Sequence, residues 1–73
     1  RVVAGDVNIG ELNAELGLRI PEEDFTTVGG FVFGLLGRLP VVGDRATGGG
    51  AQFTVRAMDG RRIRSLIVEV EPG

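Results

Sequence analysis

The residue types that usually carry out catalysis are scarce in this chain. It contains no histidine and no cysteine, so the commonest general base and the usual zinc ligands are both missing. The remaining candidate nucleophiles are threonines and the single Ser65, and no imidazole is present to accept their protons. A Ser/His/Asp triad is therefore impossible within these 73 residues. We expect a domain that is not an enzyme, with no catalytic residue and no cofactor of its own.

Three adjacent carboxylates, Glu22, Glu23 and Asp24, are the first candidate metal site. Carboxylates bind hard cations such as Mg2+, but a binding cage collects about six oxygens from several parts of the chain. Three sequence neighbours do not converge unaided. We favour a solvated turn whose charges stabilise the positive end of the helix that follows, and we predict no metal ligand.

Four arginines gather in the last third of the chain, at positions 56, 61, 62 and 64. One interpretation is that they bind an anion or the carboxylates of a partner. The other is a solvated sheet face on which Glu69, Glu71 and the acidic turns neutralise the arginines. The solvated face is the preferred interpretation. Arg61 and Arg62 remain candidate interface residues. The chain as a whole carries a net charge of -2, which argues against nucleic acid as a partner.

Two glycine-rich segments suggest phosphate binding only superficially. The run Gly48 to Gly50 precedes an expected strand, whereas phosphate loops lead into a helix N-terminus. Gly29, Gly30 and Gly34 lie inside an expected helix at the wrong spacing for a dinucleotide fingerprint.

Two helices are expected to position these side chains. Asn8 and Glu11 have capping-box spacing ahead of a helix over residues 9–16, which Gly17 can end. A strand over residues 1–4 precedes it. The second helix begins at Val28 after a Thr27 cap, and Gly37 followed by Pro40 ends it.

The second helix presents two different sides. A core stripe consists of Val28, Phe31, Val32, Leu35 and Leu36. On the other side, Gly30 and Gly34 project together, and we expect another backbone to approach them closely. Phe33 lies near these glycines, where it fills a second core layer or contacts a partner. Phe33 is thus our first candidate interface residue.

A hairpin is expected in the last third of the chain. We place a three-residue loop at Met58–Gly60, with Gly60 in the left-handed position. That register sets Val55 opposite Ile63, on one face with Phe53 and Ile67, and puts Arg56 beside Arg62 on the outer face. The returning strand carries apolar residues on both faces, so we expect it to be central in the sheet or covered on both sides.

Chain length allows one small domain, residues 1–73. Its longest apolar run is far shorter than the ~20 residues of a membrane span, and no signal peptide is recognisable. We expect no direct membrane insertion by this segment. The chain opens on Arg1-Val2-Val3, already strand-like and without an initiator methionine, which favours a fragment of a longer protein.

The combined pattern resembles a known family, the transporter-associated domain at the C-terminus of CorC/HlyC proteins. The matching motifs are Asp24-Phe25-x-Thr27-x-Gly29-Gly30, Leu36-Gly37-Arg38-Leu39-Pro40, Gly43-Asp44, Phe53-x-Val55 and Asp59-Gly60-Arg61-Arg62-Ile63. The early Gly5-Asp6 and Asn8-Ile9-x-Glu11-Leu12-Asn13 segments also resemble that domain.

The resemblance implies a parent membrane protein with a paired CBS module, associated with magnesium and cobalt efflux or with haemolysins. It implies an accessory role at the cytoplasmic face of the membrane and a fold similar to part of an FAD-binding fold. The family brings no catalytic residues, so Thr27, Gly37, Pro40 and Gly60 are interpreted as architectural. Gly30 and Gly34 of the second helix are assigned to the same architectural set.

Together these patterns predict an α+β domain with two helices on one face of a mainly antiparallel sheet of about four strands. We expect a regulatory or assembly module that contacts the CBS or membrane domains of its parent, or a second copy of itself as a homodimer. The alternative is a binding domain for an adenine nucleotide or a flavin, with the ligand beside Gly30 and Gly34.

Overall fold

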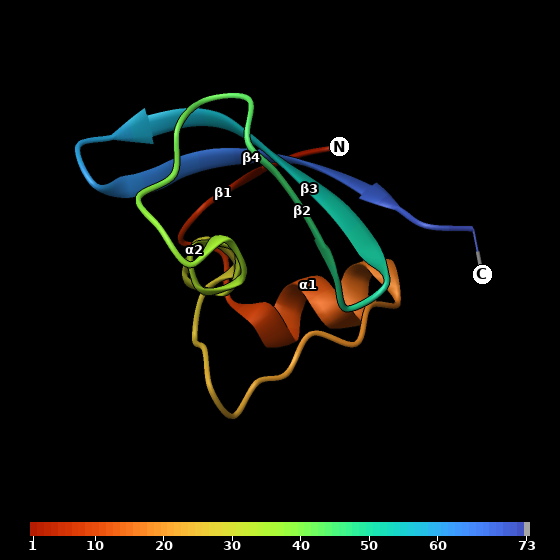
Figure 1. Cartoon of the computed structure of the whole chain (residues 1–73). Coiled ribbons are helices and arrows are strands. Elements are labelled where there is room, and N and C mark those ends of the chain that lie inside the picture. Colours follow the sequence, from red (N-terminus) through yellow and green to blue (C-terminus); the bar gives the residue numbers. More distant parts are fainter. Residues whose placement is uncertain (73) are drawn as a thin grey trace.

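The computed structural model describes residues 1–72 and shows two helices packed on one face of a four-stranded sheet (Figure 1). The elements follow the chain in the order β1 (Val2–Ala4), α1 (Ile9–Leu16), α2 (Val28–Leu36), β2 (Arg45–Gly48), β3 (Ala51–Asp59) and β4 (Arg62–Val70). The strand order is β1-β4-β3-β2, and every neighbouring pair is antiparallel. The predicted α+β class and the central position of the last strand are confirmed.

Both helices begin and end where the capping residues predict. The Asn8 side chain accepts a hydrogen bond from the Glu11 N–H at 3.3 Å, and the Thr27 hydroxyl accepts one from the Gly30 N–H at 3.1 Å. Gly17 and Gly37 end the helices in the left-handed conformation, with φ of 68° and 67°. These caps satisfy backbone groups that each helix leaves without an internal partner.

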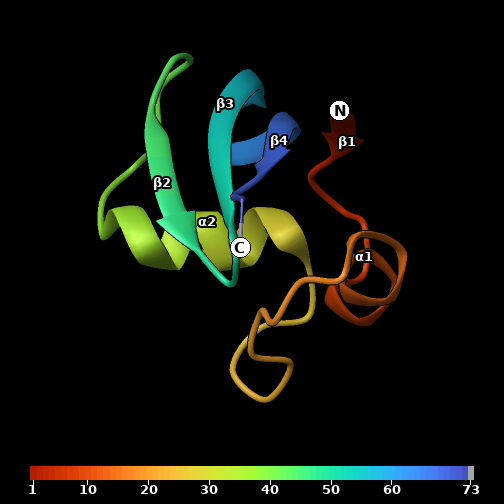
Figure 2. The same ribbon diagram turned by 90° about the vertical axis from the view of Figure 1, so that its right-hand side faces the viewer.

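The core lies between the two helices and the sheet, with Ile9 and Leu12 of α1 buried in it. On α2, Val28, Phe31 and Val32 are buried, which confirms the first part of the predicted stripe, whereas Leu35 is 44% exposed. The Phe31 ring meets Phe53 of β3 edge to face, with ring centroids 5.8 Å apart. Figure 2 shows α2 running beneath the strands while α1 lies beside β1. A fully buried aromatic cluster therefore fixes α2 against the sheet.

The predicted hairpin register is wrong. Val55 lies opposite Leu66 rather than Ile63, and Thr54 opposite Ile67. The two-residue turn is Gly60-Arg61, with positive φ only at Gly60, as in a type II′ turn. The observed register places the apolar pairs Phe53–Val68 and Val55–Leu66 together on the helix-covered face, and all four side chains are buried. This continuous apolar face explains why the register is preferred.

The pairing of the hairpin arginines also differs from the prediction. Arg62 lies opposite Asp59, and Arg56 is the extra residue of a bulge between Val55 and Ala57. The Arg56 guanidinium donates a hydrogen bond to the Ser65 hydroxyl at 3.4 Å, so the two arginines are not a cross-strand pair.

Strand β2 (Arg45–Gly48) is the fourth strand of the sheet, whose position the sequence did not indicate. It ends at Gly48 and turns through Gly49 and Gly50, whose φ values of 64° and 96° suit a tight type I′ hairpin. The Arg19 N–H donates a hydrogen bond to the Gly49 carbonyl at 2.8 Å. The glycine run is therefore a hairpin turn held by a neighbouring segment.

Candidate functional site

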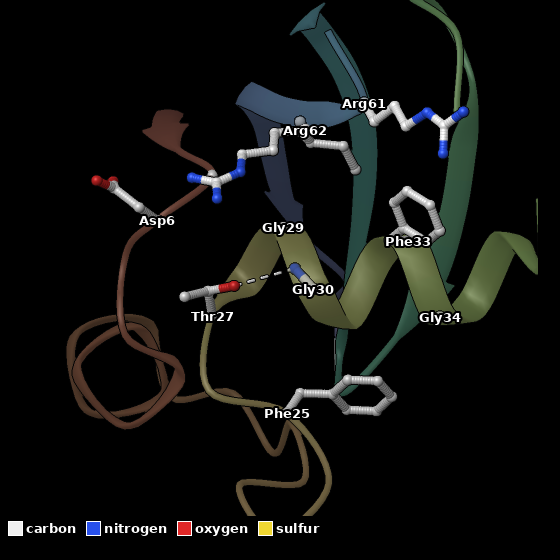
Figure 3. A pocket seen from close by; sticks show the side chains of 11 residues that line it. Asp6, Phe25, Thr27, Gly29, Gly30, Phe33, Gly34, Arg61 and Arg62 are labelled. Atoms are coloured by element: carbon white, nitrogen blue, oxygen red, sulfur yellow. Dashed lines mark hydrogen bonds between the residues drawn. The ribbon is translucent and has the colours of Figure 1, made fainter. Parts of the chain in front are cut away.

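A groove of about 650 Å³ opens beside helix α2 (Figure 3). Four segments meet around it: the β1–α1 turn, the segment before α2, α2 itself and the β3–β4 hairpin. Its lining residues are Gly5, Asp6, Phe25, Thr27, Gly29, Gly30, Phe33, Gly34, Arg61, Arg62 and Ile63.

The walls of the groove are mainly apolar. Phe33 of α2 stands on one side and is 38% exposed. Phe25, half-buried, lies on the other side and packs edge to face on Phe31 at 5.6 Å. Gly30 is exposed between them, because a helix without a side chain at that point leaves its backbone uncovered.

Another backbone does not approach Gly30 and Gly34, which corrects the prediction. A β-carbon added to Gly34 would lie 2.8 Å from the Phe25 ring, and one added to Gly30 would lie 3.2 Å from the Thr27 hydroxyl. The close backbone contact falls on Gly29, where an added β-carbon would lie 2.8 Å from the Gly5 carbonyl oxygen. The Phe25 side chain therefore lies against Gly34, and both Gly30 and Gly34 are exposed.

Gly5 and Gly29 form the junction behind the groove. The Gly29 N–H donates to the Gly5 carbonyl, and the Gly5 N–H donates to the Arg64 carbonyl, each at 2.8 Å. Both glycines are buried, and a β-carbon on Gly5 would overlap the Ile63 carbonyl. This junction joins β1, α2 and β4, and so positions the hairpin arginines relative to α2.

Charged groups stand at the rim of the groove. Arg61 and Arg62 extend from the hairpin turn, and the Arg62 guanidinium points toward Asp6 (Figure 3). Among residues 1–72 the salt bridges join Arg1 to Glu15 and Arg38 to Asp44, and neither Arg61 nor Arg62 takes part in one. Both guanidinium groups are therefore available to bind carboxylates or phosphates.

Few polar side chains line the groove. Asp6 is its single carboxylate, and the Thr27 hydroxyl already accepts the helix-capping hydrogen bond. Glu22, Glu23 and Asp24 are exposed on a loop outside the groove lining. Within the described part of the chain, no three histidine, cysteine, aspartate or glutamate side chains are grouped to hold a metal ion.

A second charged feature fixes the chain where it leaves α2. The Arg38 guanidinium binds both Asp44 carboxylate oxygens, at 2.8 and 2.9 Å, and the Val41 N–H donates to the same carboxylate at 2.9 Å. The hydrogen bonds from Arg38 and then from Val41 lower the pKa of Asp44. The bidentate pair closes the loop between α2 and β2.

The structure brings six of the residues singled out in the sequence to this one groove. They are Phe33, Arg61 and Arg62 of the expected interface, and Thr27, Gly30 and Gly34 of the architectural set. The other architectural residues lie outside it: Gly37 ends α2, Pro40 is buried in the next loop, and Gly60 opens the hairpin turn.

Sequence reasoning missed several groove residues. Phe25 belongs to the Asp24-Phe25-x-Thr27 motif and Asp6 to the Gly5-Asp6 motif, but neither motif indicated a groove residue. Phe25 lies two residues before the Thr27 cap and packs on Phe31, the fourth residue of α2, which is close to the hydrophobic-staple arrangement. Nothing in the local sequence indicated the contact between Gly5 and Gly29, which lie 24 positions apart.

Arg56 and Arg64 lie elsewhere. Together with Arg62 they line a second groove of about 630 Å³, bordered by β1 and the hairpin. The four hairpin arginines therefore divide between two grooves.

Comparison with known proteins places the chain clearly. The transporter associated domain model CorC_HlyC matches residues 2–72. The magnesium and cobalt efflux protein CorC of Vibrio cholerae is 37% identical over 62 residues, which are 85% of this chain and 21% of that protein. The chain thus corresponds to about a fifth of that relative's length.

Solved structures agree with this result. A CorC-associated region from Neisseria meningitidis, described as belonging to a Mg2+ and Co2+ transporter, is 35% identical with a TM-score of 0.87, covering 94% of this chain and 85% of that one. A CorC_HlyC domain of a Xylella fastidiosa hemolysin, in complex with Mg++ and Mn++, is 28% identical with a TM-score of 0.84, covering 97% and 86%. Neither helix in residues 1–72 has the length and apolar character needed to cross a bilayer. By its sequence over residues 2–72 and by its fold, the chain belongs to the CorC_HlyC transporter associated domain family.

Proposed function

We propose that this chain is a non-catalytic regulatory or assembly domain of a CorC-type magnesium and cobalt efflux protein. The observation that carries the proposal is the groove beside α2, where an exposed aromatic ring and two arginines without ion pairs in residues 1–72 meet on a largely apolar surface. Such a combination of aromatic and arginine side chains is typical of protein contact sites.

The mechanism follows from differential contact. If Phe33, Arg61 and Arg62 touch a neighbouring domain in one transport state more strongly than in another, the contact shifts the balance between the states. The partner in this proposal is the CBS or membrane domain of the parent, or a second copy of the chain, at the cytoplasmic face of the membrane. The relation to the CorC protein of Vibrio cholerae, of which the chain matches 21%, supports this setting.

Substitutions in the parent protein test the proposal. We expect Phe33→Ala combined with Arg61→Ala and Arg62→Ala to change Mg2+ efflux from loaded cells or to weaken assembly of the parent. Val42→Ala and Arg45→Ala form the matched control, since both side chains are exposed and lie outside the groove. If the groove variant and the control give the same efflux and assembly as the unaltered protein, the proposal is wrong.

A small-molecule site is the second candidate, because a groove of about 650 Å³ falls in the size range of ligand pockets. Its openness argues against it: Gly30, Phe33, Gly34, Arg61 and Arg62 are all exposed, whereas ligand pockets bury most of the ligand surface. Thermal denaturation with adenine nucleotides, flavins and Mg2+ separates the two functions. A true ligand raises the melting temperature with concentration, and a contact module shows no rise.

A further inference from the structure

The surface around the groove changes character in a regular order. At one end the hairpin turn carries Arg61 and Arg62, in the middle α2 presents Gly30 and Phe33, and beyond Phe25 the loop before α2 carries exposed Glu23 and Asp24. Figure 1 shows α2 between the hairpin tip and this loop, and Figure 3 shows the two arginines and Phe25 on opposite sides of the helix. We call this surface the α2 face, defined by residues 23–25, 30, 33, 34, 61 and 62.

The charged side chains of the α2 face are exposed. Neither the arginines of the hairpin end nor Glu23 and Asp24 belong to a salt bridge in residues 1–72. Asp6 lies beside Arg62 (Figure 3), so the hairpin end carries two positive charges and one negative charge and stays basic. Helix α2 separates this end from the acidic end. An apolar strip with Phe33 38% exposed lies between them.

This order is the one that a two-fold symmetric contact requires. In such a contact the same patch occurs on both subunits, and a residue pair formed once is formed a second time by symmetry. A two-fold axis through the apolar middle would set the arginines of each copy against the carboxylates of the other. It would also bring the two Phe33 rings together beside the exposed Gly30 positions.

From this charge complementarity we infer that the α2 face binds a second copy of the same face, with the axis near Gly30 and Phe33. The inference rests on the proposed role of this face as a contact surface, and it names the partner. Arg61 and Arg62 are the basic half of each contact, and Glu23 and Asp24 are the acidic half. Both ends lie at the rim of the contact, so salt weakens the dimer.

A charge-exchange experiment tests the dimer directly. The chain can be studied alone, since the matching Neisseria meningitidis region was crystallised by itself. This chain covers 85% of that region. Sedimentation equilibrium is expected to show a monomer–dimer equilibrium. Arg61→Glu with Arg62→Glu, and separately Glu23→Lys with Asp24→Lys, should each raise the dimer dissociation constant about tenfold or more.

Mixing the two reversed variants should restore association. In the mixed dimer one contact pairs the introduced glutamates with the introduced lysines, and the other contact pairs the original residues. The control, Arg45→Glu with Arg64→Glu, makes the same charge change at exposed positions outside the α2 face and should leave the dissociation constant unchanged. Circular dichroism of each variant verifies that the fold is retained.

Three results would overturn the inference. These are a chain that stays monomeric up to about 1 mM, a dimer that neither reversed variant weakens, and a mixture that associates no better than its components. Efflux by the parent protein separates this inference from the proposed function. If the chain is monomeric but the Phe33 and arginine variants still alter efflux, the α2 face contacts another domain. If the dimer is confirmed but the variants leave efflux unaltered, the regulatory role is contradicted and the dimer inference stands.

Discussion

Replacement of Gly29 by alanine is expected to destabilise the domain far more than the same change at the two neighbouring helical glycines. Gly29, Gly30 and Gly34 all lie in α2, and an alanine in a helix interior gains about 1 kcal/mol over glycine. Helix propensity alone would give the three substitutions the same effect on the free energy of unfolding. Their surroundings differ, so the measured order of stability reports the tertiary contacts.

The contacts allow the magnitudes to be worked out. At Gly29 the new β-carbon would lie 2.8 Å from the Gly5 carbonyl oxygen, and Gly5 is itself held by the Arg64 carbonyl. Relieving this overlap requires a backbone shift, and overpacking of this kind costs about 1 to 3 kcal/mol. The higher helix propensity of alanine offsets only part of this cost. We expect a loss of about 2 kcal/mol in the free energy of unfolding.

The other two positions should be far milder. At Gly34 the β-carbon would meet the Phe25 ring at 2.8 Å, but this ring is half-buried and can turn aside, so we expect a change of about 1 kcal/mol or less. At Gly30 the nearest atom is the Thr27 hydroxyl at 3.2 Å, and a small shift accommodates it. Gly30→Ala should therefore raise stability by about 0.5 to 1 kcal/mol.

Chemical denaturation monitored by circular dichroism measures all three variants. In a domain of this size, 1 kcal/mol corresponds to about 4 to 8 °C in melting temperature, so the expected spread is easily resolved. Hydrogen exchange at the Gly29 amide adds a local readout of its bond to Gly5. Equal stability of the Gly29 and Gly30 variants, or a Gly30 variant less stable than the Gly29 variant, would refute the assigned contacts.

Substitutions at four further positions test other parts of the structure. Because Arg38 lowers the pKa of Asp44, the stability from this pair is present above the ordinary aspartate pKa and is lost as the pH falls through the lowered pKa. The unaltered chain should therefore melt at a higher temperature than Asp44→Asn near neutral pH, and this difference should shrink as the pH falls below about 4. A difference that persists at about pH 2 would contradict the pairing. Thr27→Ala should remove about 1 kcal/mol by deleting the α2 cap, with Thr27→Ser retaining most of it in urea titrations. Phe53→Ala should lower the free energy of unfolding by about 3 to 5 kcal/mol, because Phe53 is fully buried. Phe33→Ala should lower it by about 1 kcal/mol or less. A larger loss at Phe33 would show that this residue belongs to the core and is not a contact residue.

The helices could be predicted because their boundaries depend on local groups. Asn8 and Thr27 are each within three residues of the amide that they cap, and glycine ends each helix in a conformation that other residues avoid. The hairpin register could not be predicted in the same way. Two offsetting bulges around Arg56 and Arg64 and the choice of Gly60-Arg61 as the turn depend on which faces the helices cover.

The groove residues could likewise be predicted only where the signal is local. Phe33 was recognised as lying off the core stripe, and Arg61 and Arg62 as a charged pair, since helix periodicity and hairpin signals are local. That they share one groove depends on the junction between Gly5 and Gly29 and on the position of Phe25. These contacts join residues distant in the chain, for which the local pattern carries no information.

By itself, the sequence determined the absence of histidine and cysteine chemistry, the two capped helices, the likeness to the transporter-associated domain and the candidate residues for contact. Only the tertiary structure decided which glycine meets a backbone, which strand faces form the core, and that Arg38 binds Asp44. The physical reason is range. Caps, turns and periodicity act over a few residues, whereas close packing and charge pairing are settled by the one arrangement that buries the apolar faces together.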